Sequence, residues 1–441
     1  MKIRSLIVAA FVLVTLVGTL YWSEHRKPTD ETAKASGDTP PTILKLDEGA
    51  ITKLELKKKD AEPITLARNS SGTWQITQPN PLGADQSTVS RALSSLSSLK
   101  SERLVEDKAP DLKRYGLDRP AVEMDITEKD NKAHRLLIGD ETPTGSAVYA
   151  MLAGDARVFT MATFNKNSID KSLNDLRDKR LLTVNADKIS RMELIRKNQT
   201  IEFGRNKDEW QILKPKPLRA DSFQVGELAR KLTDARMDLS GTAKDLAEAA
   251  AAFAHATPVA TAKVTDQSGT QEVQVRKSKD TYYAKSSVVD GAYKVDSDLG
   301  QTLDNGLDDF RNKKLFDFGF TDPAKIEMHS GSKAYFLSRS GADWRSNGRK
   351  VDAGSVQSLV SKLRDLAASK FVDSAFINPS IEVTVTSDDT KRVEKVSIVK
   401  SGNSYIAKRE NEPTLYQLQS SSIDELQKAA DEAKLATPPA K

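Results

Sequence analysis

The chain has 441 residues, which is too long for one ordinary hydrophobic core and predicts two to four domains. Lys and Arg total 67 and Asp and Glu total 62, and this nearly balanced charge argues against a dedicated nucleic-acid-binding protein. Cysteine is absent, which excludes disulfides, thiolate nucleophiles and soft metal sites.

The first predicted element is a membrane anchor. Lys2 and Arg4 precede an uncharged, apolar run at 6–22. As a helix this run would span roughly 26 Å, close to the ~30 Å hydrocarbon core of a bilayer. Tyr21 and Trp22 end the run, and their amphipathic rings suit the membrane interface. These features predict that the protein contacts the lipid bilayer through residues 6–22.

A cleaved signal peptide is the alternative interpretation of residues 1–22. The run ends in bulky residues, whereas a signal-peptide cleavage site needs small ones, so the sequence favours an uncleaved anchor. The basic residues before the run place the N-terminus inside. We therefore expect a single-pass protein of the inner (cytoplasmic) membrane with its bulk in the periplasm or outside the cell. Residues 23–43 are polar and rich in Pro and Thr, which predicts a flexible linker.

Beyond the linker the sequence repeats itself. The stretch "GTWQITQPNPLGAD" at 72–85 returns as "DEWQILKPKPLRAD" at 208–221. Trp210 follows Trp74 by 136 positions, and Trp344 follows Trp210 by 134. The segments before and after the tryptophans recur more loosely. The chain is therefore predicted to contain three copies of one unit.

A helix is expected after each repeated tryptophan. Asp85, Asp221 and Asp352 are residues that cap helix N-termini, and apolar residues follow each of them at spacings of three and four. Later segments alternate apolar and polar residues, as strands do, and short turns between them leave little room for crossover helices. We predict an α+β fold: an N-terminal transmembrane helix, then three tandem modules with mostly antiparallel sheets, at 44–183, 184–318 and 319–436.

This arrangement resembles a bacterial family known only as domain of unknown function 4340. The residues that carry the resemblance are the Trp-to-Asp segments above, "YGLDRP" at 115–120, "IGDET" at 138–142 and "LRDKRLL" at 176–182. The resemblance implies a membrane-anchored extracytoplasmic protein, associated with gliding-type or other ABC transport systems. No catalytic residues come with the family.

The sequence contains few candidate catalytic or metal-binding motifs. None of the four histidines stands at metal-ligand spacing from another, and no phosphate-binding glycine loop or nucleophile elbow occurs. Asp296 and Asp298 could supply oxygen ligands to Ca²⁺, but a solvated turn is favoured. Asp140 and Glu141 are adjacent, so a hairpin turn is favoured over an acid–base pair. We expect neither enzymatic activity nor a bound cofactor.

Two repeated features have alternative interpretations. The tryptophans are either core residues beneath their helices or exposed platforms for sugar or peptide, and their recurrence favours the core. Arg177 and Arg311 lie at the junctions between copies, in "LRDKRLL" and "FRNKKLF". They either pair with a carboxylate of the neighbouring module or simply solvate a helix end.

Three functions follow from these patterns. The leading hypothesis is a membrane-anchored scaffold that engages a protein partner such as a transporter or envelope complex. The alternative is a module that binds envelope polysaccharide or peptide. A hydrolase with a dispersed site is the least favoured, because no catalytic motif occurs. It stays among the hypotheses because the members of a Ser-His-Asp triad can lie far apart in sequence.

Overall fold

The computed structural model describes residues 41–207, 209–387 and 391–433. The predicted anchor, nearly all of the predicted linker and the last few residues of the predicted third module lie outside these ranges. Within them, no helix combines the length and the apolar character needed to cross a membrane.

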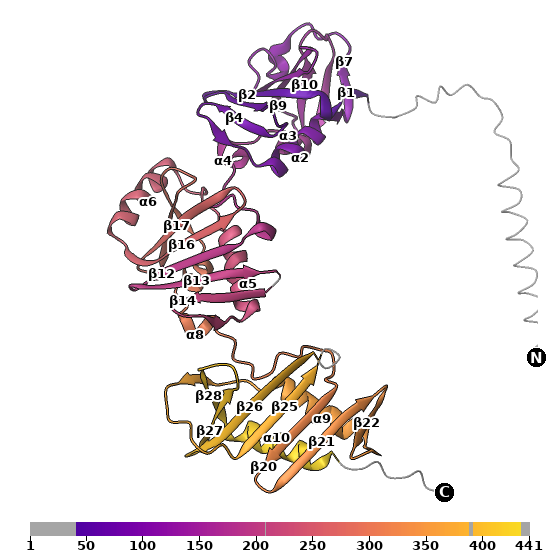
Figure 1. The fold of residues 1–441 in the computed structure, drawn as a ribbon. Coiled ribbons are helices and arrows are strands. Elements are labelled where there is room, and N and C mark those ends of the chain that lie inside the picture. The colour runs from indigo at the N-terminus through magenta and orange to yellow at the C-terminus, as the bar shows by residue number, and fades with distance from the viewer. Residues whose placement is uncertain (1–40, 208, 388–390, 434–441) are drawn as a thin grey trace, which may run out of the picture. The chain divides into compact units, whose positions relative to one another are not determined.

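The chain divides into two compact units that meet between Asp178 and Lys179. The first unit contains one large sheet and the second contains two, each with its own helices (Figure 1). We call these the first, second and third modules. All strand pairs of the three large sheets are antiparallel, which confirms the predicted α+β class with antiparallel sheets.

The first module has a nine-stranded sheet in the order β5-β4-β3-β2-β8-β9-β10-β11-β7 and a two-stranded sheet of β1 and β6. Its elements are β1 (Thr42–Lys45), β2 (Ile51–Lys58), β3 (Ile64–Arg68), β4 (Trp74–Gln78), β5 (Leu82–Gly83), α2 (Gln86–Ser97), β6 (Ser98–Lys100), β7 (Arg103–Glu106), β8 (Val122–Glu128), β9 (Ala133–Glu141), β10 (Ala147–Leu152), β11 (Val158–Ala162), α3 (Thr163–Ile169) and α4 (Leu173–Leu176).

The second module has an eight-stranded sheet in the order β15-β14-β13-β12-β16-β17-β18-β19. Its elements are β12 (Arg191–Arg196), β13 (Gln199–Asn206), β14 (Glu209–Lys214), β15 (Leu218–Arg219), α5 (Ser222–Thr233), α6 (Ala243–His255), β16 (Thr257–Asp266), β17 (Gly269–Ser278), β18 (Thr281–Ser286), β19 (Ala292–Val295), α7 (Ser297–Leu303) and α8 (Leu307–Phe310).

The third module has a nine-stranded sheet in the order β23-β22-β21-β20-β25-β26-β27-β28-β24. Its elements are β20 (Lys325–Ser330), β21 (Lys333–Ser340), β22 (Asp343–Ser346), β23 (Arg349–Lys350), α9 (Ala353–Asp365), β24 (Lys370–Val372), β25 (Ile381–Ser387), β26 (Arg392–Ser401), β27 (Ser404–Arg409), β28 (Leu415–Gln419) and α10 (Ser420–Glu432).

The three large sheets share one topology. In each, four strands run outward from the centre of the sheet, a helix returns the chain, and four more strands run outward on the other side. The first and third modules add an edge strand between this helix and the next four strands, which is β7 in the first module and β24 in the third. The second module has α6 in that part of the sequence instead. This common strand order is the strongest structural evidence that the three modules are copies of one unit.

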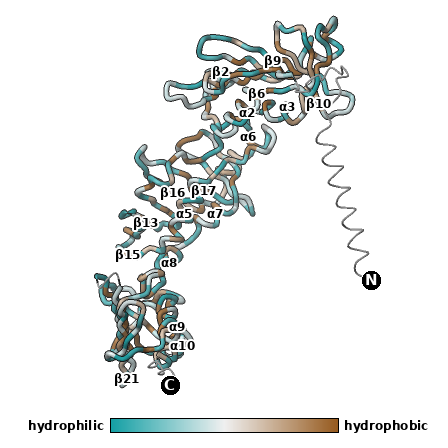
Figure 2. The backbone as a smooth tube through the Cα atoms, turned by 90° about the vertical axis from the view of Figure 1, so that its right-hand side faces the viewer, coloured by the Kyte–Doolittle hydropathy of each residue, from teal (hydrophilic) through white to brown (hydrophobic). Residues whose placement is uncertain are grey.

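Alternating hydropathy produces these sheets. In β25, for example, Ile381, Val383 and Val385 are buried while the residues between them are partly exposed. Since successive strand residues point to opposite faces, this pattern gives each sheet one apolar face for its helices to cover. Figure 2 shows hydrophobic and hydrophilic residues alternating along the strands.

Each repeated tryptophan is buried in the core of its module. Trp74, Trp210 and Trp344 expose 4%, 8% and 3% of their surface. The three aspartates that follow them are N-cap residues of α2, α5 and α9, and each carboxylate accepts backbone N–H bonds from the first turn of its helix. None of these three indoles is therefore an exposed platform.

The two motifs found only in the first module pack against each other. Gly116 ends a turn with a φ of 65°, a left-handed conformation that favours glycine. Gly139 lies so close to this turn that a Cβ there would stand 2.0 Å from the carbonyl oxygen of Tyr115. "YGLDRP" and "IGDET" are thus the two sides of one close backbone contact, and Asp140 and Glu141 end strand β9 ahead of a turn.

Candidate functional site

The junction segment at 310–316, "FRNKKLF", connects the second and third modules by backbone pairing on both sides. Toward the second module, the N–H of Asn312 donates to the carbonyl of Arg219 at 3.0 Å. Toward the third module, the N–H of Leu315 donates to the carbonyl of Leu366 at 2.9 Å. The segment therefore lies against both modules, and the side chains around it form the candidate site.

Arg311 contacts the third module, but through uncharged groups. Its guanidinium stacks on the Phe371 ring, 3.4 Å from the centroid, and donates to the Thr414 hydroxyl at 3.2 Å. Its carboxylate partner is Asp308, at 2.9 Å, in its own module. The structure places Arg177 in a backbone bridge with Ala84 of the first unit, and its predicted pairing with a neighbouring module stays a prediction.

A charged network surrounds the second junction segment. Arg219, at the end of β15, reaches Asp317 at 2.5 Å and Glu412 at 3.6 Å. Arg409 of β27 contacts Glu412 at 2.8 Å and Glu394 at 3.0 Å. Arg219 of the second module is thus joined to Asp317, directly after the junction segment, and to Glu412 of the third module. We call the five residues Arg219, Asp317, Glu394, Arg409 and Glu412 the charged junction.

The charged junction is largely withdrawn from solvent. Side-chain exposure is 4% for Glu394, 13% for Arg409 and 20% for Arg219. Carboxylates this deeply buried need partners, because an unpaired buried charge is strongly unfavourable. Arg409 also donates to the carbonyl of Leu315, at 2.6 Å, and the backbone N–H of Asp317 donates to Glu394 at 3.0 Å. Side chains and backbone therefore hold the junction segment together.

A tyrosine completes the polar network. The Tyr416 hydroxyl donates to Glu412 at 2.6 Å and accepts from Arg219 at 3.3 Å. Burial, together with the hydrogen bond to Glu412, raises the pKa of Tyr416 well above its ordinary value. The hydroxyl consequently stays protonated and acts as a fixed donor.

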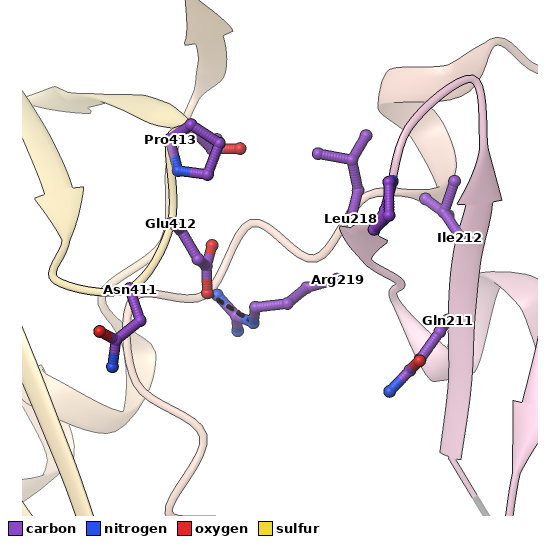
Figure 3. A pocket seen from close by; sticks show the side chains of 9 residues that line it. Gln211, Ile212, Leu218, Arg219, Asn411, Glu412 and Pro413 are labelled. Carbon is purple, nitrogen blue, oxygen red and sulfur yellow. Dashed lines mark ion pairs between the residues drawn. The ribbon is translucent and has the colours of Figure 1, made fainter.

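A cavity of about 280 Å³ opens beside the charged junction. As Figure 3 shows, Gln211, Ile212 and Leu218 line one side of it, and Pro413 lies on the opposite side with Glu412. The side chain of Arg219 crosses between the two sides toward Glu412.

The residues of this site are suited to holding two modules together. The arginine guanidinium groups are hydrogen-bond donors only, and the carboxylates already accept hydrogen bonds from arginine or backbone donors. No nucleophile next to a general base is found among the lining residues of the cavity. The arrangement fixes the second module to the third.

The other sequence candidates do not converge on a site. Asp296 caps α7 and Asp298 pairs with Lys231 at 2.8 Å, so neither carboxylate faces a cation pocket. His134 contacts Glu128 at 3.1 Å, and His329 packs on the Phe336 ring. Within the ranges that the structure describes, no cluster of three His, Cys, Asp or Glu residues is arranged to hold a metal ion.

The shared topology and the bonded junction define a tandem-repeat protein built from α+β modules. Residues 74–216 and 210–387 match the model of a family described as domain of unknown function (DUF4340), and the chain belongs to this family. Both matches begin at a repeated tryptophan, and the first continues past the junction segment at 176–182. No curated protein matches the sequence.

Proposed function

We propose that this protein is a membrane-anchored extracytoplasmic scaffold that engages a protein partner such as an ABC-type transporter or a gliding-type envelope complex. The observation that carries the proposal is the charged junction, where buried ion pairs are used to fix one module to the next. Side chains that form such pairs hold two modules at a fixed spacing. A scaffold requires such a fixed spacing.

Two sequence features support the membrane and partner parts of the proposal. The uncharged run at 6–22, preceded by Lys2 and Arg4, has the length and flanking charge of an inner-membrane anchor with its N-terminus inside. The modules that follow offer three related surfaces, which suits a partner with several contact points.

The experiment is purification of the full chain from native membranes in mild detergent, followed by identification of co-purified proteins. The scaffold role predicts a defined partner in constant ratio through successive columns. Protease added outside the cytoplasmic membrane should also digest residues 44–436. Recovery of the chain alone, or protection of the modules from external protease, would contradict the proposal.

The alternative, a module that binds envelope polysaccharide or peptide through its tryptophans, is less well supported. Trp74, Trp210 and Trp344 are buried, so none offers a ring face to a ligand. A saccharide site would need other residues.

A further inference from the structure

The first module differs from the other two where its helices meet. In the second module, Lys231 of α5 forms an ion pair with Asp298 of α7 at 2.8 Å. In the third, Lys362 of α9 pairs with Glu425 of α10 at 2.6 Å. An ion pair therefore clamps the two helices together in both modules.

The register of the helices identifies the matching positions in the first module. Buried Val89, Ala92 and Leu96 of α2 correspond to buried Val225, Leu228 and Leu232 of α5, at one constant offset. That offset places Ser95 at the position of Lys231. In the same way, Ile169 of α3 corresponds to Leu303 of α7, which places Phe164 at the position of Asp298. The first module thus has neither member of the clamp.

A groove of about 700 Å³ lies between α2 and α3 at this place. Its lining includes Ser87, Arg91, Ser95, Phe164, Ser168 and Lys171. The Phe164 ring is 77% exposed, which is unusual for a large apolar side chain in a polar surrounding. The groove is large enough for an oligomeric ligand, and we call it the α2/α3 groove.

Two cations in the groove lack a carboxylate partner. Arg91 donates to the Thr88 hydroxyl at 3.1 Å, and Lys171 donates to the carbonyl of Asn167 at 2.7 Å. Among the residues that the structure describes, neither forms an ion pair. Both keep donors available for an incoming anion.

The hydroxyls of the groove offer acceptors. Ser95 donates to the carbonyl of Arg91 at 3.0 Å, and Ser168 donates to that of Phe164 at 3.0 Å. Because each hydroxyl hydrogen is already committed to the helix backbone, the oxygen lone pairs remain for a ligand that donates O–H bonds. Glu48 lies at the margin, where it accepts from Ser94 at 2.7 Å.

We propose that the α2/α3 groove binds an acidic saccharide, such as a segment of a uronic-acid polysaccharide. The carboxylate of a uronic acid would pair with Arg91 or Lys171, its hydroxyls would donate to the serine oxygens, and the C–H face of the sugar ring would stack on Phe164. An amphipathic peptide helix fits less well, because it needs several apolar pockets and the groove has one exposed ring. This proposal is independent of the scaffold role.

The test is calorimetric titration of the full chain, in non-ionic detergent at low salt, with tetragalacturonate. Maltotetraose serves as the neutral saccharide and inorganic phosphate as the bare anion. We expect the protein to bind tetragalacturonate but neither maltotetraose nor phosphate. Replacing Arg91→Ala together with Lys171→Ala should weaken it by about tenfold or more, since charge-assisted hydrogen bonds are lost.

Two further variants keep the result interpretable. Ser95→Lys with Phe164→Asp rebuilds the clamp of the second module and should abolish binding while the thermal midpoint is retained. Lys231→Ala, on the matching helix of the second module, is the control and should bind like the wild type. The proposal is overturned if the wild type does not bind tetragalacturonate, if phosphate binds equally well, or if the rebuilt clamp leaves binding intact.

Discussion

The segments that enter the second and third modules have the same backbone pairing but different side chains around them. The N–H of Leu181 donates to the carbonyl of Ala235, as that of Leu315 donates to Leu366. Asp317, Glu394 and Arg409 surround the segment that enters the third module. The matching positions on the second module's side of the first junction hold Thr183, Gln271 and Ser286. The register of strands β17 and β26, and of β18 and β27, establishes this correspondence.

Individual hydrogen bonds of the charged residues have counterparts among the neutral residues. The N–H of Thr183 donates to the Gln271 amide at 2.8 Å, as the N–H of Asp317 donates to Glu394 at 3.0 Å. The Ser286 hydroxyl donates to the carbonyl of Leu181, where Arg409 donates to that of Leu315. Thr183, Gln271 and Ser286, which we call the neutral set, therefore hold the segment that enters the second module. Asp317, Glu394 and Arg409, the charged set, hold the segment that enters the third module in the same way.

The difference coincides with the division of the chain into units. The division falls within the first junction segment, while the second lies inside one unit. Arg219, the residue of the second module that joins the charged junction, corresponds to Gly83 in the first module. The position that carries the arginine of the charged junction in the second module therefore has no side chain in the first.

The largest effect is expected for Arg409→Ala. This change removes the nearer of the two arginines that pair with buried Glu394, leaving only Arg392 at 3.5 Å, and it leaves the carbonyl of Leu315 without its donor. Loss of one partner of a buried pair costs about 3–5 kcal/mol. Ser286→Ala, the matched change in the neutral set, should cost about 1–2 kcal/mol because it removes only neutral hydrogen bonds, to Leu181 and from Val288. Chemical denaturation of both variants of the full chain measures the difference. Equal costs would contradict the contrast between the two sets.

A second prediction converts one set into the other. Arg219→Gly, Asp317→Thr, Glu394→Gln and Arg409→Ser together install the neutral set of the first junction in the second. Because the two arginines are replaced together with Asp317 and Glu394, and Glu412 keeps its hydrogen bond from Tyr416, the combined variant should be less destabilised than Arg409→Ala alone. Hydrogen exchange of the peptide at 310–318 should nevertheless become faster, since the segment loses its charge-assisted bonds. A cost equal to the sum of the single changes would show that the charges act independently.

The same exchange of neutral for charged chemistry occurs inside the modules and gives a pH dependence. Thr65 donates to Gln78 at 2.9 Å in the first module, and Glu202 pairs with Lys214 at 2.7 Å in the second. The Lys214 hydrogen bond holds the pKa of Glu202 below the ordinary glutamate value. Its stabilisation is therefore complete above the unfolded-state pKa and is lost as the pH falls through the lower folded-state pKa.

Glu202→Gln should accordingly cost about 1–2 kcal/mol at neutral pH and progressively less in acid, because the wild type loses the same interaction on protonation. Denaturation of wild type and variant from pH 7 down to pH 3 checks this convergence. Thr65→Val in the first module is the control, and its cost should not change with pH. A constant cost for Glu202→Gln would rule out the charged pair as its origin.

The sequence allowed the repeat, its strands and its helix caps to be predicted, because these depend on neighbours in the chain. Trp74 and Asp85, for example, each recur in the later copies within a local pattern of apolar residues. That pattern is enough to predict one strand and one helix. The charged junction could not be predicted in this way, since Arg219 and Glu412 are brought together only by the fold. Helix α6 was also missed, although the alanine-rich run before His255 has the propensity to form it.

The smallest effect tests whether the modules are otherwise equivalent. Asp85→Ala, Asp221→Ala and Asp352→Ala each remove a carboxylate that accepts N–H bonds at a helix N-terminus, and each should cost about 1 kcal/mol. The three helices share the same buried positions, so similar local costs are expected, measured by hydrogen exchange within α2, α5 and α9. Equal costs would show that the helix caps contribute alike to the three modules. A cost that is much larger in α5 or α9 would instead mean that the charged junction is coupled to the stability of the whole second unit.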